Sequence, residues 1–336
     1  MLRFFFWIAI LGMSRLCWSS PHDQTPFYLR CTSSCTEDCL VAQKEENFPL
    51  ELNLFLWDCK ANCQYECMWK QEQIRQNQSV EKGAKFKPAK YFGKWPFIRI
   101  LGMQEVASTA FSLGNAAPHV WFAIFRKNDI APQGWYMRGY VLTGSFIYVF
   151  GWLCSALFHA RDTPLTEKMD YFSATLMVTY ALWTTLLRIF GPFARRPRAF
   201  RFVRGALALW YCSHLYYMTF VLFDYGYNVK VAIFLGSVNF LIWLFYIARI
   251  RRRYQWKMIA SLVWTHASLA LEIYDIPPIF GLFDSHSLWH ALTIPVGYLY
   301  YCFIVDDAAF EMKRTTTKSS SMNHADWVNG ISDKTV

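Results

Sequence analysis

Two histidines near the C-terminal end of the chain, His286 and His290, stand one helical turn apart. Side chains four residues apart lie on one face of a helix, so both imidazoles can face the same ligand. A third histidine, His159, follows Ser155 by four residues, and Asp170 comes eleven residues later. Three imidazoles with one open coordination position are typical of catalytic zinc sites, which lower the pKa of a bound water to about 7. These five residues predict zinc-assisted hydrolysis.

A single His-x3-His pair is a weak signal, and the common depth of the five residues strengthens it. Each stands at the end of an apolar segment, where an ionisable group is costly and therefore a functional candidate. Glu272 and Asp275 lie at a similar depth. They could support the site, contact lipid headgroups or simply be solvated. Three other histidines in apolar segments have no second histidine one turn away, and we expect them to form hydrogen bonds between helices: His119, His214 and His266.

The elements that must position these residues are apolar segments of membrane-spanning length. With 54% hydrophobic and 19% aromatic residues, the 336-residue chain is too apolar for two soluble domains. Its apolar segments are close to the about 20 residues that cross a hydrocarbon core. The sequence therefore predicts an all-α membrane protein with a bundle of seven transmembrane helices between residues 97 and 305. The expected segments are 106–125, 139–158, 171–187, 205–223, 231–248, 258–274 and 288–305.

The net charge of +10 lies mainly in alternate connections between these segments, which carry Arg126, Lys127, six arginines between 188 and 204, and four between 249 and 253. Cytoplasmic loops carry such an excess of Lys and Arg. The N-terminus is then expected in the lumen, and residues 306–336 form a cytoplasmic tail, which we expect to be disordered from Glu311 to Val336. Topology and anionic lipid headgroups explain the basic loops without a nucleic-acid partner.

The N-terminal residues predict a signal peptide over 1–20 and a cysteine-rich luminal domain over 21–96. A short apolar core follows Arg3 and ends in small residues at Ser19 and Ser20. Two cysteine triplets follow, each spaced by four residues, which puts each triplet along one helical face: Cys31, Cys35, Cys39 and Cys59, Cys63, Cys67. We expect disulfides in this oxidising compartment, although six cysteines permit fifteen pairings, and a zinc cluster is the alternative. Asn77 is a glycosylation acceptor or a chance match.

The five residues also resemble a known group, the CREST superfamily of seven-helix membrane hydrolases and receptors, whose pattern they match without a gap. Longer strings resemble its family of glycosylphosphatidylinositol (GPI)-anchor lipid-remodelling phospholipases. They are residues 65–69, 93–97, 159–163, 166–172, 223–228 and 289–290. Phe92 is a departure, because a histidine is expected before Gly93, but this position is outside the proposed site.

The resemblance implies a phospholipase A2-type enzyme that removes the sn-2 acyl chain from GPI-anchored proteins in the Golgi, or alternatively in the endoplasmic reticulum. Our hypothesis is that His159, His286 and His290 hold zinc, while Asp170 acts as base and then acid. Ser155 and zinc would stabilise the oxyanion. Ceramide-type amide hydrolysis and a receptor or cargo factor with structural zinc are the alternatives. A transporter fits less well, because its ionisable residues would lie at the midplane.

Overall fold

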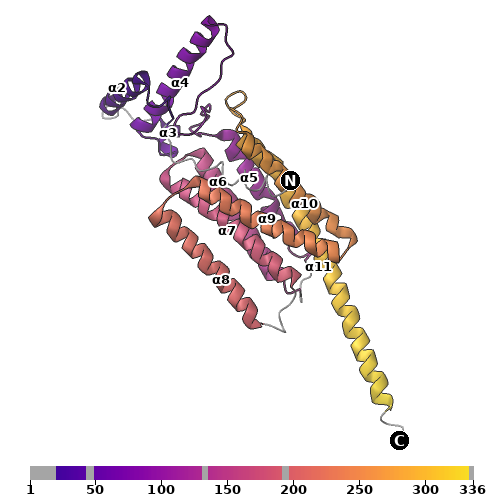
Figure 1. The fold of residues 1–336 in the computed structure, drawn as a ribbon. Helices are drawn as coiled ribbons and strands as arrows, with labels where there is room; N and C mark the ends of the chain where they lie inside the picture. The colour runs from indigo at the N-terminus through magenta and orange to yellow at the C-terminus, as the bar shows by residue number, and fades with distance from the viewer. Residues whose placement is uncertain (1–19, 43–48, 131–134, 191–196, 333–336) are drawn as a thin grey trace.

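The chain folds into helices in two parts, an N-terminal region and a helical bundle (Figure 1). The computed structural model describes residues 20–42, 49–130, 135–190 and 197–332. Within these ranges β-structure is limited to three isolated bridges, so the all-helical prediction is confirmed there. The predicted signal peptide falls outside the described residues except for Ser20.

Three disulfides join two helices of the N-terminal region, α2 (Pro26–Ala42) and α4 (Cys59–Glu81), on either side of the short α3 (Leu50–Leu54). The pairs are Cys31–Cys67, Cys35–Cys63 and Cys39–Cys59. The spacing of four in each triplet brings the cysteines to one face per helix, and the nested order of the pairs makes the helices antiparallel. The disulfide prediction is confirmed, and all six sulfur atoms are used, which leaves none for a zinc cluster.

Every segment that the sequence predicts as membrane-spanning lies on a helix of the bundle. These helices are α5 (Val106–Trp121), α6 (Arg138–Ala160), α7 (Pro164–Ile189), α8 (Pro197–Tyr216), α9 (Tyr225–Arg249), α10 (Trp256–Tyr274) and α11 (Ser285–Ser332). Two are extended by π-helical turns, η1 (Phe122–Arg126) after α5 and η3 (Tyr217–Val221) after α8, and the short η4 (Arg253–Gln255) precedes α10.

Four of these helices are long and apolar enough to cross a membrane: α6, α7, α9 and Ser285–Arg314 of α11. The chain is thus a multi-pass membrane protein, and the predicted count of seven crossings depends on α5, α8 and α10. Helix α5 has 16 residues and buries polar groups such as Ser112 and Asn115. Arginines occupy the first turns of α8, and α10 has 19 residues with Glu272 near its end. Polar residues and limited length separate these three helices from the other four.

The packing of α5 against α6 and α11, and of α6 against α7, brings the candidate residues to one end of the bundle. Thr163 caps the start of α7, and the Asp284 carboxylate accepts from the Ser287 N–H at the start of α11. Helices α6 and α7 approach each other closely at Gly151, where an added Cβ would lie 2.5 Å from the Met177 sulfur. We call this end, which carries His159 and His286, the histidine end.

The connection between α9 and α10 lies at the other end, which we call the arginine end. Helix α9 begins at the histidine end, where the Tyr225 and Tyr171 rings are 5.5 Å apart, and its 25 residues extend about 37 Å. Helix α11 reaches Ser332, so the prediction of a disordered tail is wrong for 311–332. No proline interrupts that stretch.

Candidate metal centre

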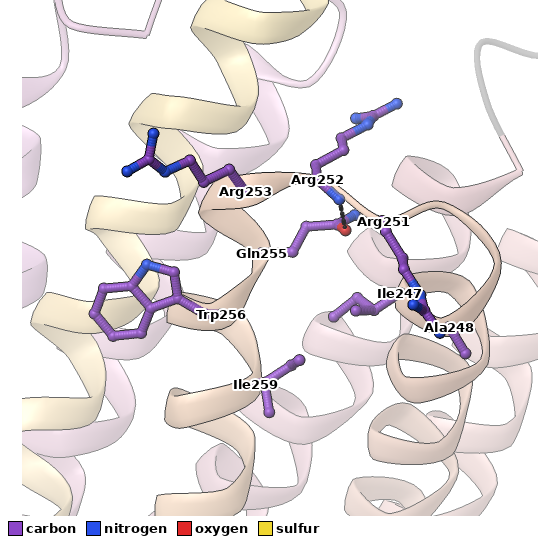
Figure 2. A pocket seen from close by; sticks show the side chains of 8 residues that line it. All are labelled: Ile247, Ala248, Arg251, Arg252, Arg253, Gln255, Trp256 and Ile259. Atoms are coloured by element: carbon purple, nitrogen blue, oxygen red, sulfur yellow. Dashed lines mark hydrogen bonds between the residues drawn. The ribbon is translucent and has the colours of Figure 1, made fainter.

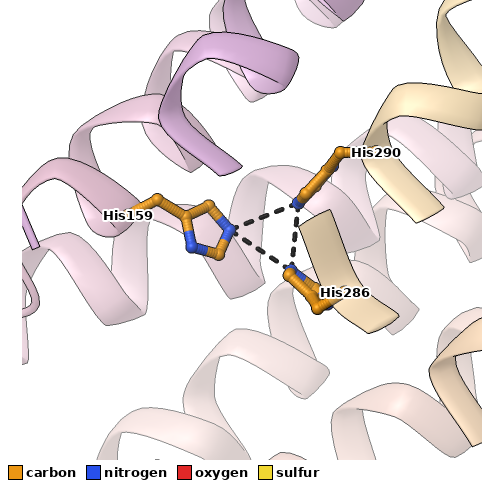
Figure 3. Close-up of side chains that lie close together, drawn as sticks. All are labelled: His159, His286 and His290. Carbon is orange, nitrogen blue, oxygen red and sulfur yellow. Dashed lines mark hydrogen bonds between the residues drawn. The ribbon is translucent and has the colours of Figure 1, made fainter. Parts of the chain in front are cut away.

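Three imidazoles meet at the histidine end of the bundle, as Figure 3 shows. His159 is the second-last residue of α6, whereas His286 and His290 are one turn apart in the first turns of α11. The Nε2 atoms of His159 and His286 are 3.2 Å apart, those of His159 and His290 are 3.2 Å apart, and those of the α11 pair are 3.0 Å apart. Nitrogen ligands of a tetrahedral zinc ion are about 3.3 Å apart. The triangle of Nε2 atoms fits one such ion.

Two carboxylates on the outer side of the imidazoles fix their orientation. The Nδ1 atom of His159 is 2.7 Å from Glu105 Oε2, and that of His286 is 2.8 Å from Glu272 Oε2. When each Nδ1–H donates to its carboxylate, both Nε2 lone pairs face the centre of the triangle, where they repel unless a cation lies between them. A carboxylate behind a histidine is a common arrangement in zinc sites. The donor set therefore fits a metal ion.

His290 is held differently from the other two histidines. Its side chain is 2% exposed and its Nδ1 atom has no hydrogen-bond partner among the described residues. Its backbone carbonyl accepts from the side-chain amide of Asn115, at 2.7 Å. Trp152 packs edge-on against its ring at a centroid distance of 5.4 Å. Packing and the backbone of α11, rather than a carboxylate, position this imidazole.

A group of oxygen-bearing side chains adjoins the triangle. The Ser155 hydroxyl adjoins the Asp170 carboxylate, and it lies 3.2 Å from the Ser112 hydroxyl of α5. Ser155 precedes His159 by one turn of α6, and Asp170 stands in the second turn of α7. The structure thus brings all five residues that the sequence singles out to one end of the bundle. A base and a hydroxyl beside three imidazoles have the composition of a hydrolytic site.

Glu105 also joins the triangle to Lys94. One of its carboxylate oxygens meets His159, and the other is 3.1 Å from Lys94 Nζ, which lies 2.7 Å from Asp162. Burial alone would raise the pKa of Glu105, but the charge of Lys94 and the contact with His159 outweigh it and hold that pKa well below its usual range. Burial likewise opposes the charge of Lys94, yet the two carboxylates raise its pKa. Glu105 is therefore charged and available to His159 as an acceptor.

The comparison with protein families decides the identity of this chain. The model of the Per1-like family matches residues 49–308. The chain belongs to the Per1-like family. The matched region includes the three histidines, both outer carboxylates and α4 of the N-terminal region.

Similar Per1-like proteins cover nearly the whole chain. A zebrafish (Danio rerio) protein named GPI-specific phospholipase A2-like PGAP3 is 33% identical over 86% of this chain and 91% of its own length. The human (Homo sapiens) protein of that name is 30% identical over 93% and 96%. The Schizosaccharomyces pombe Protein PER1 homolog is 32% identical over 94% and 95%. The resemblance to post-GPI attachment to proteins factor 3 and its family, predicted from the motifs, is confirmed.

Sequence reasoning missed two residues of this Per1-like site. Glu105 and Ser112 stand on or just before α5, whose polar character the sequence shows without indicating a partner for each group. For Glu272 the sequence left open a supporting contact to the site, a contact to lipid headgroups or solvation. Its contact with His286 identifies the supporting role. Asp275 is not at the site, because its carboxylate accepts from the Trp95 indole at 2.8 Å. One signal could have identified Glu105. It is a carboxylate directly before the first apolar segment, and that segment carries several polar residues.

The histidines that were set aside behave mainly as predicted. His119 lies 2.8 Å from the Tyr301 hydroxyl of α11, and His214 lies 3.1 Å from the Asn228 side chain of α9. The prediction for His266 is wrong, because its Nδ1 atom lies 2.8 Å from the Leu262 carbonyl within the same helix. Its contact with α9 is ring packing on Phe240. The Leu262 carbonyl, one turn earlier in α10, thus takes the place of the partner on another helix that the sequence predicts for His266.

A cavity between α9 and α10 is distant from the histidines. It has a volume of about 480 Å³ and lies at the arginine end, between α9 and α10 (Figure 2). Its walls combine Ile247 and Ile259 with Arg251, Arg253 and Trp256, and it contains no histidine or carboxylate. The groups in this cavity therefore lack the chemistry for ester hydrolysis.

Proposed function

We propose that this Per1-like protein is a zinc-dependent phospholipase that removes the sn-2 acyl chain from GPI-anchored proteins during lipid remodelling. The observation that carries the proposal is the triangle of Nε2 atoms, with outer carboxylates on two imidazoles and Asp170 with Ser155 beside it. The relatives named GPI-specific phospholipase A2-like PGAP3 support the substrate.

His159, His286 and His290 would hold the zinc ion, which when bound supplies a Lewis acid that activates water and polarises the ester carbonyl. Among the described residues, three side chains bring potential ligand atoms close enough together to share one ion, and all three are these histidines. A tetrahedral ion held by three protein ligands keeps one position for water or substrate, whereas structural sites are closed by four. A site with three protein ligands therefore favours a catalytic zinc ion over the structural zinc ion of a receptor or cargo factor.

Asp170 carries the proton in the proposed reaction. Its carboxylate takes a proton from the attacking water as the water oxygen forms a bond to the ester carbonyl carbon. Ser155 then donates a hydrogen bond to the negatively charged carbonyl oxygen. When the bond between the carbonyl carbon and the sn-2 oxygen breaks, Asp170 returns its proton to that oxygen. The products are a fatty acid and a lysolipid that retains the glycan and the attached protein.

We further propose that the histidine end faces the lumen of the Golgi or the endoplasmic reticulum. The arginines between α7 and α8 and between α9 and α10 would then be cytoplasmic. Acyl chains can approach between helices from the luminal leaflet, while the attached protein remains beside the disulfide-linked helix pair. Accessibility of a cysteine introduced at Gln78, on the exposed end of α4, to a membrane-impermeant reagent in intact vesicles tests this orientation.

The decisive experiment measures zinc and acyl release in the same purified preparations. His290→Ala and His286→Ala should lower the zinc content from about one ion per chain, and both variants and Asp170→Asn should lose acyl release by at least about 100-fold. His266→Ala is the matched control, because that imidazole lies away from the triangle. Full acyl release by Asp170→Asn or by His290→Ala would exclude this mechanism. Release from ceramide instead of a GPI-anchored protein would favour the amide hydrolase.

A further inference from the structure

Two arginines share one indole ring where the N-terminal region meets the bundle. The Cζ atom of Arg161 lies 4.1 Å from the Trp57 ring centre, and that of Arg99 lies 4.6 Å from it. Arg99 also lies 4.3 Å from the Tyr65 ring centre. Trp57 is 6% exposed, and its indole donates to the Gly102 carbonyl at 2.8 Å. Two positive charges are therefore held close together around a fixed aromatic group.

Neither guanidinium forms an ion pair within the described ranges of the chain, and the carboxylates that act on them, Glu51 and Glu66 on Arg99 and Asp58 and Asp162 on Arg161, do so from a longer distance. Each has a buried nitrogen without a hydrogen-bond partner there, Nη1 of Arg99 and Nε of Arg161. The one hydrogen bond from the Arg161 side chain goes to the Asp162 backbone carbonyl, at 2.8 Å. A buried N–H of a charged group that lacks an acceptor is costly and calls for an explanation.

Other arginines of this protein show how it satisfies a guanidinium in a similar position. Arg188 donates to both oxygens of Asp307 and to Glu311. Arg126 also lies over an indole, that of Trp121, but it pairs with Asp129. Of the arginines in the described residues, only Arg99 and Arg161 retain a buried nitrogen without an acceptor. Stacked arginines such as Arg126 and Arg252 thus also have a carboxylate partner, which Arg99 and Arg161 lack in the part of the chain that the structure describes.

The pair is directly connected to the candidate metal centre. Arg161 follows His159 by two residues, and the backbone N–H groups of Gln104 and Glu105 donate to the carbonyls of Ala160 and His159, each at 2.9 Å. These bonds tie the segment that carries Arg99 to the end of α6 that carries Arg161. An anion on the two guanidinium groups would therefore be held at a fixed position relative to the three imidazoles.

We propose that Arg99 and Arg161 bind a phosphodiester of the GPI anchor and so position the substrate for cleavage at the metal centre. This inference rests on the proposed function, because the phosphodiester is what distinguishes a GPI lipid from a neutral acyl lipid or a ceramide. Arginine recognises phosphate oxygens through paired N–H donors, and two guanidinium groups can donate to one phosphodiester at once. Both arginines are half-buried, and their accessible N–H groups would then donate to phosphate.

The test measures binding, not turnover, so that it does not depend on the reaction. The full chain in detergent micelles is titrated with a fluorescent GPI-anchored reporter protein and with a glucosyl diacylglycerol that has the same acyl chains and no phosphate. We expect Arg99→Gln and Arg161→Gln each to weaken reporter binding by about tenfold or more and to leave glucosyl diacylglycerol binding unchanged. Arg126→Gln, which removes a stacked but paired arginine, should bind both probes like the wild type.

Two further measurements separate a substrate site from a structural joint and from a site for free phosphate. Inorganic phosphate should compete with the reporter, whereas chloride at equal ionic strength should compete less, and Arg161→Lys should restore part of the affinity by restoring charge. Equal loss of both probes, unchanged reporter binding in the glutamine variants, or phosphate that stabilises the wild type without displacing the reporter would each overturn the proposal. Arginine-dependent binding without acyl release would instead leave it standing and refute the hydrolase.

Discussion

At the scale of single residues, Glu105 and Glu272 decide whether three convergent imidazoles can act as metal ligands. Each accepts from the Nδ1–H of one histidine and so directs the Nε2 lone pair inward. We expect Glu105→Gln and Glu272→Gln each to reduce zinc affinity by about 10- to 100-fold, as measured by competition with a zinc chelator. Asp275→Asn removes a carboxylate that contacts Trp95 instead of a histidine. That control should keep wild-type affinity, and wild-type affinity in both glutamine variants would contradict the orienting role.

Tyr91 provides a pH-dependent prediction at the same scale. Burial and the hydrogen bond to the Glu72 carboxylate raise the pKa of Tyr91 above its ordinary value of 10.0. A raised folded-state pKa contributes stability that is complete below the unfolded value and is lost as pH rises through the folded value. The thermal midpoint of the full chain should therefore fall above about pH 10, and the fall should be smaller in Tyr91→Phe. An identical alkaline decrease in the two proteins would rule out this contribution.

The residues that sequence reasoning found and those it missed differ in how their partners are spaced. Ser155 and His159, and likewise His286 and His290, are recognisable because each pair is spaced by one helical turn, whereas Asp170 is recognisable because it stands at the same depth at the start of the next apolar segment. Glu105 meets His159 from 54 residues away, and Glu272 meets His286 across the connection from α10 to α11. No periodicity encodes such a contact, because it depends on how two helices pack. The residues that converge at the histidine end were therefore predictable from the sequence, whereas Glu105 was not, and Glu272 was named only with several possible roles.

At the scale of helices, a buried ion cluster joins α7 to α11 at the arginine end. Arg188 bonds to both Asp307 oxygens, and Tyr254 donates to the same carboxylate at 2.7 Å. Arg188→Met should destabilise the protein by about 3 kcal/mol, because it leaves Asp307, which is 1% exposed, without its main partner. Arg188→Met with Asp307→Leu should recover part of this loss. Thermal unfolding in detergent measures both variants, and a double variant less stable than the single one would refute uncompensated charge as the cause.

The apolar segments predicted where the helices of the bundle lie. They predicted less well how long each helix is and which helices cross the membrane. The segments for α6, α7 and α9 were each contained in a helix that meets the length and composition of a membrane span. Helix α5 combines Pro118 with buried serines, and its apolar character is spread over a π-helical extension. Helix α11 continues past Val305 because nothing in the following sequence stops it. Composition identifies apolar helices well but not where helices with many polar residues end.

At the scale of the whole molecule, the N-terminal region is joined to the bundle through a close backbone contact at Gly102. This glycine has φ of +80°, and an added Cβ would lie 2.4 Å from the Glu51 carbonyl oxygen of α3. Its own carbonyl accepts from the Trp57 indole. The contact brings α3 and the ring that both arginines share against the start of the bundle. Correct placement of the N-terminal region over the histidine end therefore requires that this position have no side chain.

Gly102→Ala should separate this close approach from the cost of the backbone conformation alone. Gly83 has a similar φ of +62°, but a Cβ there meets nothing within 4 Å. Both substitutions place alanine in the left-handed region at a cost of about 1 to 2 kcal/mol, and only Gly102→Ala also forces α3 away from the bundle. We expect a larger decrease in thermal midpoint for Gly102→Ala, together with faster proteolysis between residues 82 and 105. If the two variants lost equal stability and resisted protease equally, Gly102 would serve only as a turn, and α3 would be held by Trp57 without it.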